Sequence, residues 1–300
     1  MTIIKHRNIF FVVAGLIVAG SIGAIAYFGL PLSIDFTGGS LVEVAYQDTR
    51  PNVQELKDAV TNIGIESSVR ESGENAVTIR TKTLSPSEHD ALLSALSLGG
   101  TQALTELRFN SIGPSLGSEL AIKALYALLA VIFAIVLYIA WAFRKVSRPV
   151  SSWIYGFTVV LILLHDVLVP AGFYAVLAHF TGAQVDSLFV VALLAILGYS
   201  VNDTIVIFDR VREHLKWNQE KNVKEPFEET VGKSIVETLG RSINTSVTVI
   251  LALLALAFFG SEVTQNFAYV LLAGVIAGTY SSILVAAPLL IPLSKAFAKK

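Results

Sequence analysis

Apolar residues gather along the chain in six blocks, and each block is long enough to cross a membrane as a helix. About 20 apolar residues span a bilayer at the helical rise of 1.5 Å per residue. The pattern therefore predicts a polytopic α-helical membrane protein with six transmembrane helices. The predicted spans are Ile9–Phe28, Ala121–Phe143, Trp153–Leu177, Leu188–Phe208, Ser242–Phe259 and Phe267–Leu290.

The long segment between the first two spans, residues 31–118, has the pattern of a small soluble domain. Alternation of apolar and polar residues predicts four strands, and helical spacing predicts a helix after the first strand and another after the third. The resulting order β-α-β-β-α-β is typical of a ferredoxin-like α+β domain. The predicted strands are 40–46, 67–72, 76–82 and 103–109, and the helices are 52–64 and 85–98. No catalytic cluster accompanies this pattern, so we interpret the domain as a handle or binding surface.

The distribution of basic residues predicts the orientation of the spans. Lys5 and Arg7 precede the first span, while no Lys or Arg occurs between spans three and four or between spans five and six. The other basic groups follow the second span, separate the fourth from the fifth and close the chain, so that short loops alternate as the positive-inside rule requires. We therefore expect a cytoplasmic N-terminus with the first span over 1–30, an exported domain over 31–118, and a helix bundle over 119–300. A cytoplasmic loop over 209–233 and a cytoplasmic C-terminus complete this prediction.

Composition and charge exclude several functions. Hydrophobic residues make up 54% of the 300, and the formal net charge of −1 gives no basic field for a nucleic acid. The absence of cysteine excludes disulfides and thiolate chemistry, and the five histidines show no metal-ligand spacing. No phosphate-binding loop or serine-nucleophile motif is present. We expect no enzymatic activity, no metal and no cofactor, with membrane lipid as the surroundings.

An acidic residue within the fourth span is the strongest candidate for function. Asp203 lies about 7–8 Å inside the cytoplasmic end of that span at the helical rise. A charge at mid-helix costs about 2.5–3.5 kcal/mol, so it needs a partner, water or a proton. Helical geometry places Tyr199, Asp203 and Arg210 on one line, and Gly198, Asn202 and Asp209 on an adjacent line. We expect both lines to face the bundle interior.

Two further groups extend this candidate site. His165 and Asp166 lie near the middle of the third span, and Glu237 and Arg241 share a face of the helix that leads into the fifth. Because Arg241 is expected at a depth similar to that of Asp203, the two are predicted to form an ion pair. The sequence thus favours a proton relay of Asp203, Arg241 and Asn202, supported by His165, Asp166, Asp209 and Glu237. A static structural role for the Asp–Arg and His–Asp pairs is the alternative.

Several motifs together resemble those of the SecF branch of the SecD/SecF family, membrane proteins of protein export within the RND superfamily. The motifs are SIDFTGGSLVEV (33–44), RFNSIGPSLGSEL (108–120), the pair His165-Asp166, and GYSVNDTIVIFDRVRE (198–213). The resemblance covers essentially the whole chain, including the six spans and the position of the exported domain. It places the family's intramembrane acid at Asp203 and the family's basic residue at Arg241.

The resemblance implies partners and a mechanism. It implies a SecD-type subunit with six spans of its own, the SecYEG channel, and a translocating preprotein, in the cytoplasmic membrane of a bacterium or archaeon. Protons would be the coupling ion. We expect proton binding at Asp203 to break its pair with Arg241 and to move the exported domain through hinge motifs. Those motifs contain Asp35, Phe36, Thr37, Gly38 and Gly39 before the domain, and Gly113, Pro114 and Gly117 after it. A proton-coupled exporter of small molecules or lipids and a passive scaffold subunit remain alternatives.

Overall fold

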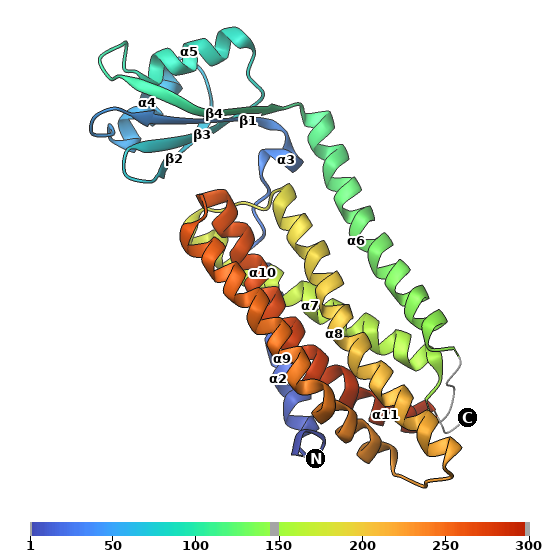
Figure 1. Cartoon of the computed structure of the whole chain (residues 1–300). Helices are drawn as coiled ribbons and strands as arrows, with labels where there is room; N and C mark the ends of the chain where they lie inside the picture. The colour runs from blue at the N-terminus through green and yellow to red at the C-terminus, as the bar shows by residue number, and fades with distance from the viewer. Residues whose placement is uncertain (1, 145–149, 298–300) are drawn as a thin grey trace. The chain divides into compact units, whose positions relative to one another are not determined.

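A computed structural model describes residues 2–144 and 150–297 of the chain (Figure 1). It contains two compact units: Leu32–Leu125, and a helical unit made of Met1–Pro31 with Tyr126–Lys300. Four of the basic residues used above to predict topology lie outside the described residues, namely Lys145, Arg148, Lys299 and Lys300.

The prediction of six membrane-spanning helices is confirmed, because six helices are long and apolar enough to cross a membrane. A short helix, α1 (Thr2–Lys5), precedes them, and the sixth span is built from three consecutive elements. The first five are α2 (Arg7–Phe28), α6 (Pro114–Ala142), α7 (Ser152–Thr181), α8 (Ser187–Glu220) and α9 (Phe227–Phe259). The sixth comprises α10 (Glu262–Ser281), the π-helical turn η1 (Ser282–Ala286) and α11 (Ala287–Phe297).

The predicted cytoplasmic connection 209–233 is mostly helical, and its cytoplasmic location stays a prediction. Helix α8 continues to Glu220 and α9 begins at Phe227, which leaves only residues 221–226 as a connection. The helices continue because apolar positions recur beyond the membrane span, with Val211 and Leu215 of α8 and Val231 of α9 buried in the same core. Charged residues occupy the remaining faces of these extensions and gave the segment the appearance of a loop.

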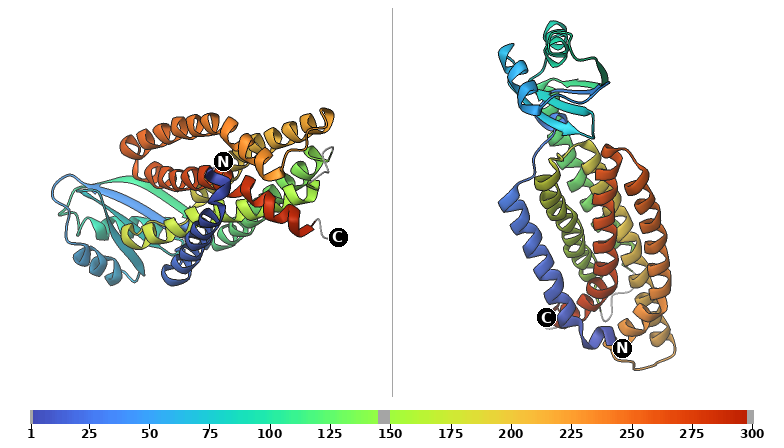
Figure 2. Two further views of the ribbon diagram at one scale, coloured as in Figure 1. Left: turned by 90° about the horizontal axis from the view of Figure 1, so that it is seen from below. Right: turned by 90° about the vertical axis from the view of Figure 1, so that its left-hand side faces the viewer.

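Small residues allow the helices of the bundle to approach closely. A Cβ atom added to Gly274 of α10 would lie 2.2 Å from Cδ1 of Ile196 in α8, and one added to Gly278 would lie 3.2 Å from Cβ of Ser200. Helix α2 packs along α7 (Figure 2), and a Cβ atom added to Gly172 of α7 would lie 2.4 Å from Cβ of Ser21 in α2. Small residues at helix contacts are the usual means of packing in membranes, where apolar burial alone does not hold helices together.

The unit Leu32–Leu125 contains the predicted ferredoxin-like domain, and its four-stranded antiparallel sheet has the order β2-β3-β1-β4. Helices α4 (Val53–Asn62) and α5 (Pro86–Leu96) cover one face of the sheet (Figure 1). Buried side chains of both layers, such as Val44, Ile79 and Leu92, form one core. The strands are β1 (Gly39–Tyr46), β2 (Ser67–Ser72), β3 (Ala76–Thr81) and β4 (Leu104–Ile112).

The two chain segments that enter and leave this domain cross each other tightly. A one-turn helix, α3 (Ile34–Thr37), ends at Gly38, whose φ of +74° favours glycine. A Cβ atom at Gly38 would lie 2.6 Å from Cα of Pro114, and one at Gly117 would lie 2.5 Å from the backbone nitrogen of Gly38. The predicted hinge motifs therefore contact one another at the backbone level, and their role as a hinge stays a prediction.

Candidate functional site

The carboxyl group of Asp203 is buried between α8 and α9. The side chain is only 4% exposed, and its Oδ1 accepts a hydrogen bond of 3.1 Å from the hydroxyl of Ser242. Its other oxygen, Oδ2, is buried without a hydrogen-bond donor among the described residues. An uncompensated carboxylate in such a place costs several kcal/mol. A proton or a cation bound at Oδ2 would therefore remove this cost.

The predicted ion pair between Asp203 and Arg241 is not formed. Arg241 is exposed on the outer side of α9, and none of the ion pairs in the described part of the chain joins it to Asp203. The reason is helical phase: consecutive residues differ by about 100° around a helix, so when Ser242 faces α8 its neighbour Arg241 cannot. Arg241 nevertheless lies next in sequence to the residue that holds the Asp203 carboxyl.

Only one of the two predicted lines on α8 faces the bundle interior. Asp203 is buried, whereas Asn202 and Asp209 are exposed. By helical geometry, these two lie on the same side of the α8–α9 pair as Arg241 and Thr248 of α9, which are also exposed. We call Asn202, Asp209, Arg241 and Thr248 the outer polar strip. Asn202 and Thr248 lie within the predicted membrane spans, where exposed polar groups are costly in lipid, and Asp209 and Arg241 lie just beyond them.

The pair His165-Asp166 is at the centre of a second buried cluster. Asp166 is fully buried, and its Oδ1 lies 2.7 Å from Nδ1 of His165. Its Oδ2 accepts hydrogen bonds from the hydroxyls of Ser281, at 3.0 Å, and of Ser200. Because these residues come from α7, α10 and α8, one carboxyl group ties three helices together.

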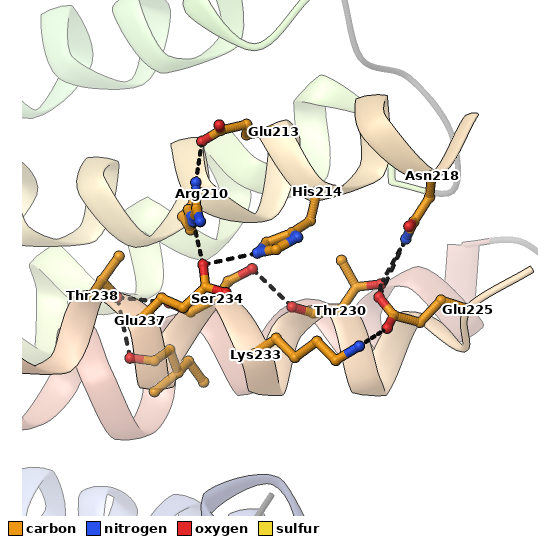
Figure 3. Close-up of polar contacts among 11 residues, drawn as sticks. Arg210, Glu213, His214, Asn218, Glu225, Thr230, Lys233, Ser234, Glu237 and Thr238 are labelled. Carbon is orange, nitrogen blue, oxygen red and sulfur yellow. Dashed lines mark hydrogen bonds and ion pairs between the residues drawn. The ribbon is translucent and has the colours of Figure 1, made fainter. Parts of the chain in front are cut away.

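A ladder of polar contacts continues along the α8–α9 interface towards the predicted cytoplasmic side (Figure 3). Glu237 accepts hydrogen bonds from Arg210 and from Nε2 of His214, the latter at 3.0 Å. Farther on, Glu225 contacts Lys233 and accepts a hydrogen bond of 2.9 Å from Thr230. The contact with Lys233 and the bond from Thr230 lower the pKa of Glu225, although burial opposes them.

The predicted site residues do not come together in one site. Asp203 lies within the α8–α9 interface, whereas Asn202 is exposed on the outer side of α8. Glu237 binds Arg210 instead of sharing a site with Arg241, and Asp209 pairs with Arg212. Three contacting residues were not among the predicted site residues: Ser200, Ser242 and Ser281. Their signal in the sequence is hydroxyl groups within apolar spans. In the described part of the chain, no group of three or more His, Asp or Glu side chains could hold a metal ion.

Two family models match the chain. Residues 95–296 match the model described as protein export membrane protein SecD/SecF, C-terminal, and residues 23–49 match the SecD/SecF GG motif. A relative in Anaerolinea thermophila named protein translocase subunit SecF is 38% identical over 97% of this chain and 93% of its own length. A protein of the same name in Thermobaculum terrenum is also 38% identical, over 96% and 92%.

A solved structure shows the same fold. The crystal structure of SecDF, a translocon-associated membrane protein from Thermus thermophilus, aligns with all of this chain at 30% identity and a TM-score of 0.82. The aligned part is 39% of that longer chain.

Proposed function

Because the chain belongs to the SecD/SecF family of protein-export membrane proteins, we propose that it promotes preprotein export by coupling it to proton flow. The observation that carries the proposal is the buried carboxyl of Asp203, which has a hydrogen bond on one oxygen and no donor on the other among the described residues. Acidic groups inside membrane helices mark ion and proton paths. The energy source would be the proton motive force across the cytoplasmic membrane, with both termini in the cytoplasm.

Asp203 alternates between two ways of balancing its charge. In one, the carboxyl carries a proton and keeps the hydrogen bond from Ser242 seen here. In the other, the proton has left and the guanidinium of Arg241 turns towards the carboxylate. Arg241 and Ser242 are neighbours on α9 and point in different directions around the helix. Replacing Ser242 by Arg241 at the carboxyl therefore requires α9 to rotate against α8. This motion gives the proton a mechanical effect.

The membrane potential supplies energy on the scale of such a rearrangement. Moving one charge across 100 mV yields about 2.3 kcal/mol. Two-state elements in proteins differ by a few kcal/mol, so one proton biases the equilibrium strongly. The helices α8 and α9 are continuous beyond the interface at Asp203, and they would carry the motion along their length.

A SecD-type subunit is the proposed partner on the outer polar strip. The strip presents an amide, a carboxylate, a guanidinium and a hydroxyl along two membrane helices. Asp209 is paired with Arg212 and the Thr248 hydroxyl bonds to its own helix, so a second six-helix subunit would bring complementary polar groups mainly to Asn202 and Arg241. The longer chain of the SecDF structure has length for such a part. The complete unit would act beside the SecYEG channel, where the exported domain contacts the emerging preprotein.

Substitution of Asp203 tests the proposal. Vesicles that contain this chain, a SecD-type subunit and the SecYEG channel should export a preprotein faster when a proton gradient is imposed. Asp203→Asn should abolish this stimulation while the assembled complex still purifies intact. Glu213→Gln, which removes an exposed acid of the same helix, is the matched control and should retain it. Full stimulation in Asp203→Asn would refute the proposed role of Asp203.

A further inference from the structure

The imidazole of His165 has one nitrogen engaged and one free. Nδ1 lies 2.7 Å from Oδ1 of Asp166, while Nε2 is buried without a hydrogen-bond partner among the described residues. The residue is 6% exposed and lies near the middle of α7, within a membrane span. Buried polar atoms are almost always hydrogen-bonded, so a free ring nitrogen at this depth calls for a ligand.

The contacts of Asp166 determine which nitrogen carries hydrogen. Two serine hydroxyls, from Ser200 and Ser281, donate to Oδ2, which is the arrangement expected for an ionised carboxylate. An ionised Oδ1 requires a donor, so Nδ1 of His165 carries the hydrogen. In the neutral imidazole Nε2 is then a bare acceptor. The cluster as a whole holds one negative charge in a low-dielectric interior.

We infer that Nε2 of His165 is a proton-binding site within the membrane, separate from Asp203. When a proton binds, the lone pair of Nε2 forms an N–H bond, the carboxylate of Asp166 stays ionised, and the cluster changes from one negative charge to none. The neighbouring carboxylate stabilises the imidazolium, as it does in other His–Asp pairs. Removing an uncompensated buried charge is favourable in itself.

The surroundings contain few other ionisable groups that could take this role. The ionisable side chains next to His165 are Asp166 on its own helix and Tyr280 of α10, whose ring stacks on the imidazole at 6.3 Å; Tyr269 of α10 lines the same groove. Helix α2 carries ionisable side chains only near its ends, and η1 and α11 carry none before Lys295. From α8 comes the hydroxyl of Ser200, with Asp203 one helical turn farther along.

His165 also lines a groove of about 490 Å³ between α2, α7 and α10, whose other lining side chains are mostly aliphatic or aromatic. Such a wall excludes water, so a change of charge at His165 has a larger electrostatic effect than it would have in water. Asp166 holds α8 through Ser200 and the start of η1 through Ser281. Neutralising the cluster would weaken both bonds, so proton binding here would loosen the contacts of α7 with the helix that carries Asp203. This role in the cycle rests on the proposed function, whereas the chemistry of the site does not.

Nitrogen NMR of histidine in the intact protein tests the inference directly. The full chain, labelled with ¹⁵N-histidine and embedded in lipid nanodiscs, is titrated from pH 9 to pH 5 without any proton gradient. The His165 signal, identified by its loss in His165→Phe, should show hydrogen on Nδ1 only at high pH and on both nitrogens at low pH. His179, an exposed residue of the same helix, provides the internal control and is identified with His179→Gln. If His165→Phe does not fold, substitutions of the other four histidines assign the signal by elimination.

Three results would overturn the inference: hydrogen on Nε2 at high pH, an unchanged neutral ring through the titration, or a ring that is doubly protonated throughout. Asp166→Asn should remove the preference for hydrogen on Nδ1, because the carboxylate that accepts it is gone. Asp203→Asn should leave the His165 titration in place. Export measurements and this titration therefore fail independently, because the titration involves neither partner nor gradient.

Discussion

Gly172 of α7 and Ser21 of α2 are in such close contact that a Cβ atom on Gly172 would lie 2.4 Å from Cβ of Ser21 and 2.5 Å from its Cα. Since one of these atoms belongs to the backbone, a rotamer change cannot relieve the contact. The first span is thus held to the third at one point where only glycine fits. This is a direct measure of how tightly α2, mostly exposed elsewhere, is attached to the bundle.

Replacing Gly172 with alanine should therefore destabilise the bundle. Overpacking of this kind costs about 1–3 kcal/mol, more than the helix propensity gained from alanine. Gly23→Ala in α2, where nothing lies within 4 Å of the added atom, is the control and should be neutral or slightly stabilising. Thermal unfolding in nanodiscs measures both. Equal stability of the two variants would contradict the close approach.

Ser242 and Asp203 should behave as a coupled pair. Ser242→Ala removes the hydrogen bond to the buried carboxyl and should cost about 1–3 kcal/mol, the penalty for an unsatisfied buried polar group. Asp203→Asn should change that cost, because it replaces the group that accepts the hydrogen bond from Ser242. A double-mutant cycle measured by unfolding gives the coupling, expected at about 0.5–3 kcal/mol for residues in contact.

Thr248→Ala serves as the control for this cycle, since the Thr248 hydroxyl bonds to backbone oxygens of its own helix. Its effect should be additive with that of Asp203→Asn. Additive effects for Ser242→Ala as well would mean that the observed hydrogen bond does not hold the carboxyl.

The contact of Glu225 with Lys233 should make the connection between α8 and α9 sensitive to acid. The folded pKa of Glu225 is lowered from an ordinary value of 4.5, so its stabilisation is complete above that value and is lost as the pH falls through the lowered pKa. Glu225→Gln should therefore increase hydrogen exchange in residues 221–226 at neutral pH, and the difference from the unchanged protein should vanish in strong acid.

The matched change is Glu220→Gln, which removes an exposed acid 3.8 Å from Lys216. Exposed pairs of this kind contribute little, so exchange should change only slightly at any pH. If Glu225→Gln still differs from the unchanged protein below the lowered pKa, the effect comes from the change in side-chain packing and not from the lost charge.

The ferredoxin-like domain could be predicted in detail because its signals are local. The hairpin turn at Gly73, the capping sequence at Ser85 and the alternation in each strand all act within a few residues, and the structure has each element close to the predicted bounds. The ferredoxin-like order then follows from the element sequence. Close packing of the buried alternating residues, such as Val42 and Val44, leaves little choice of register.

The membrane site could be located but not assembled from the sequence. An acid within an apolar span identifies Asp203 without any knowledge of its neighbours. Its partner depends on the phase of α9 against α8, and an error of one residue exchanges Ser242 for Arg241. The contacts of Asp166 with Ser200 and Ser281 depend on helix packing over 34 and 115 residues of sequence separation. No local pattern encodes such distances.

The crossing of Gly38 with Pro114 and Gly117 means that the chain leaves the ferredoxin-like domain at nearly the point where it enters it. An insert whose ends meet does not force its host apart, which is the geometry that tolerates exchange of one module for another. A larger or smaller cassette could therefore replace residues 39–113 while the lengths and spacing of the membrane helices stay as they are.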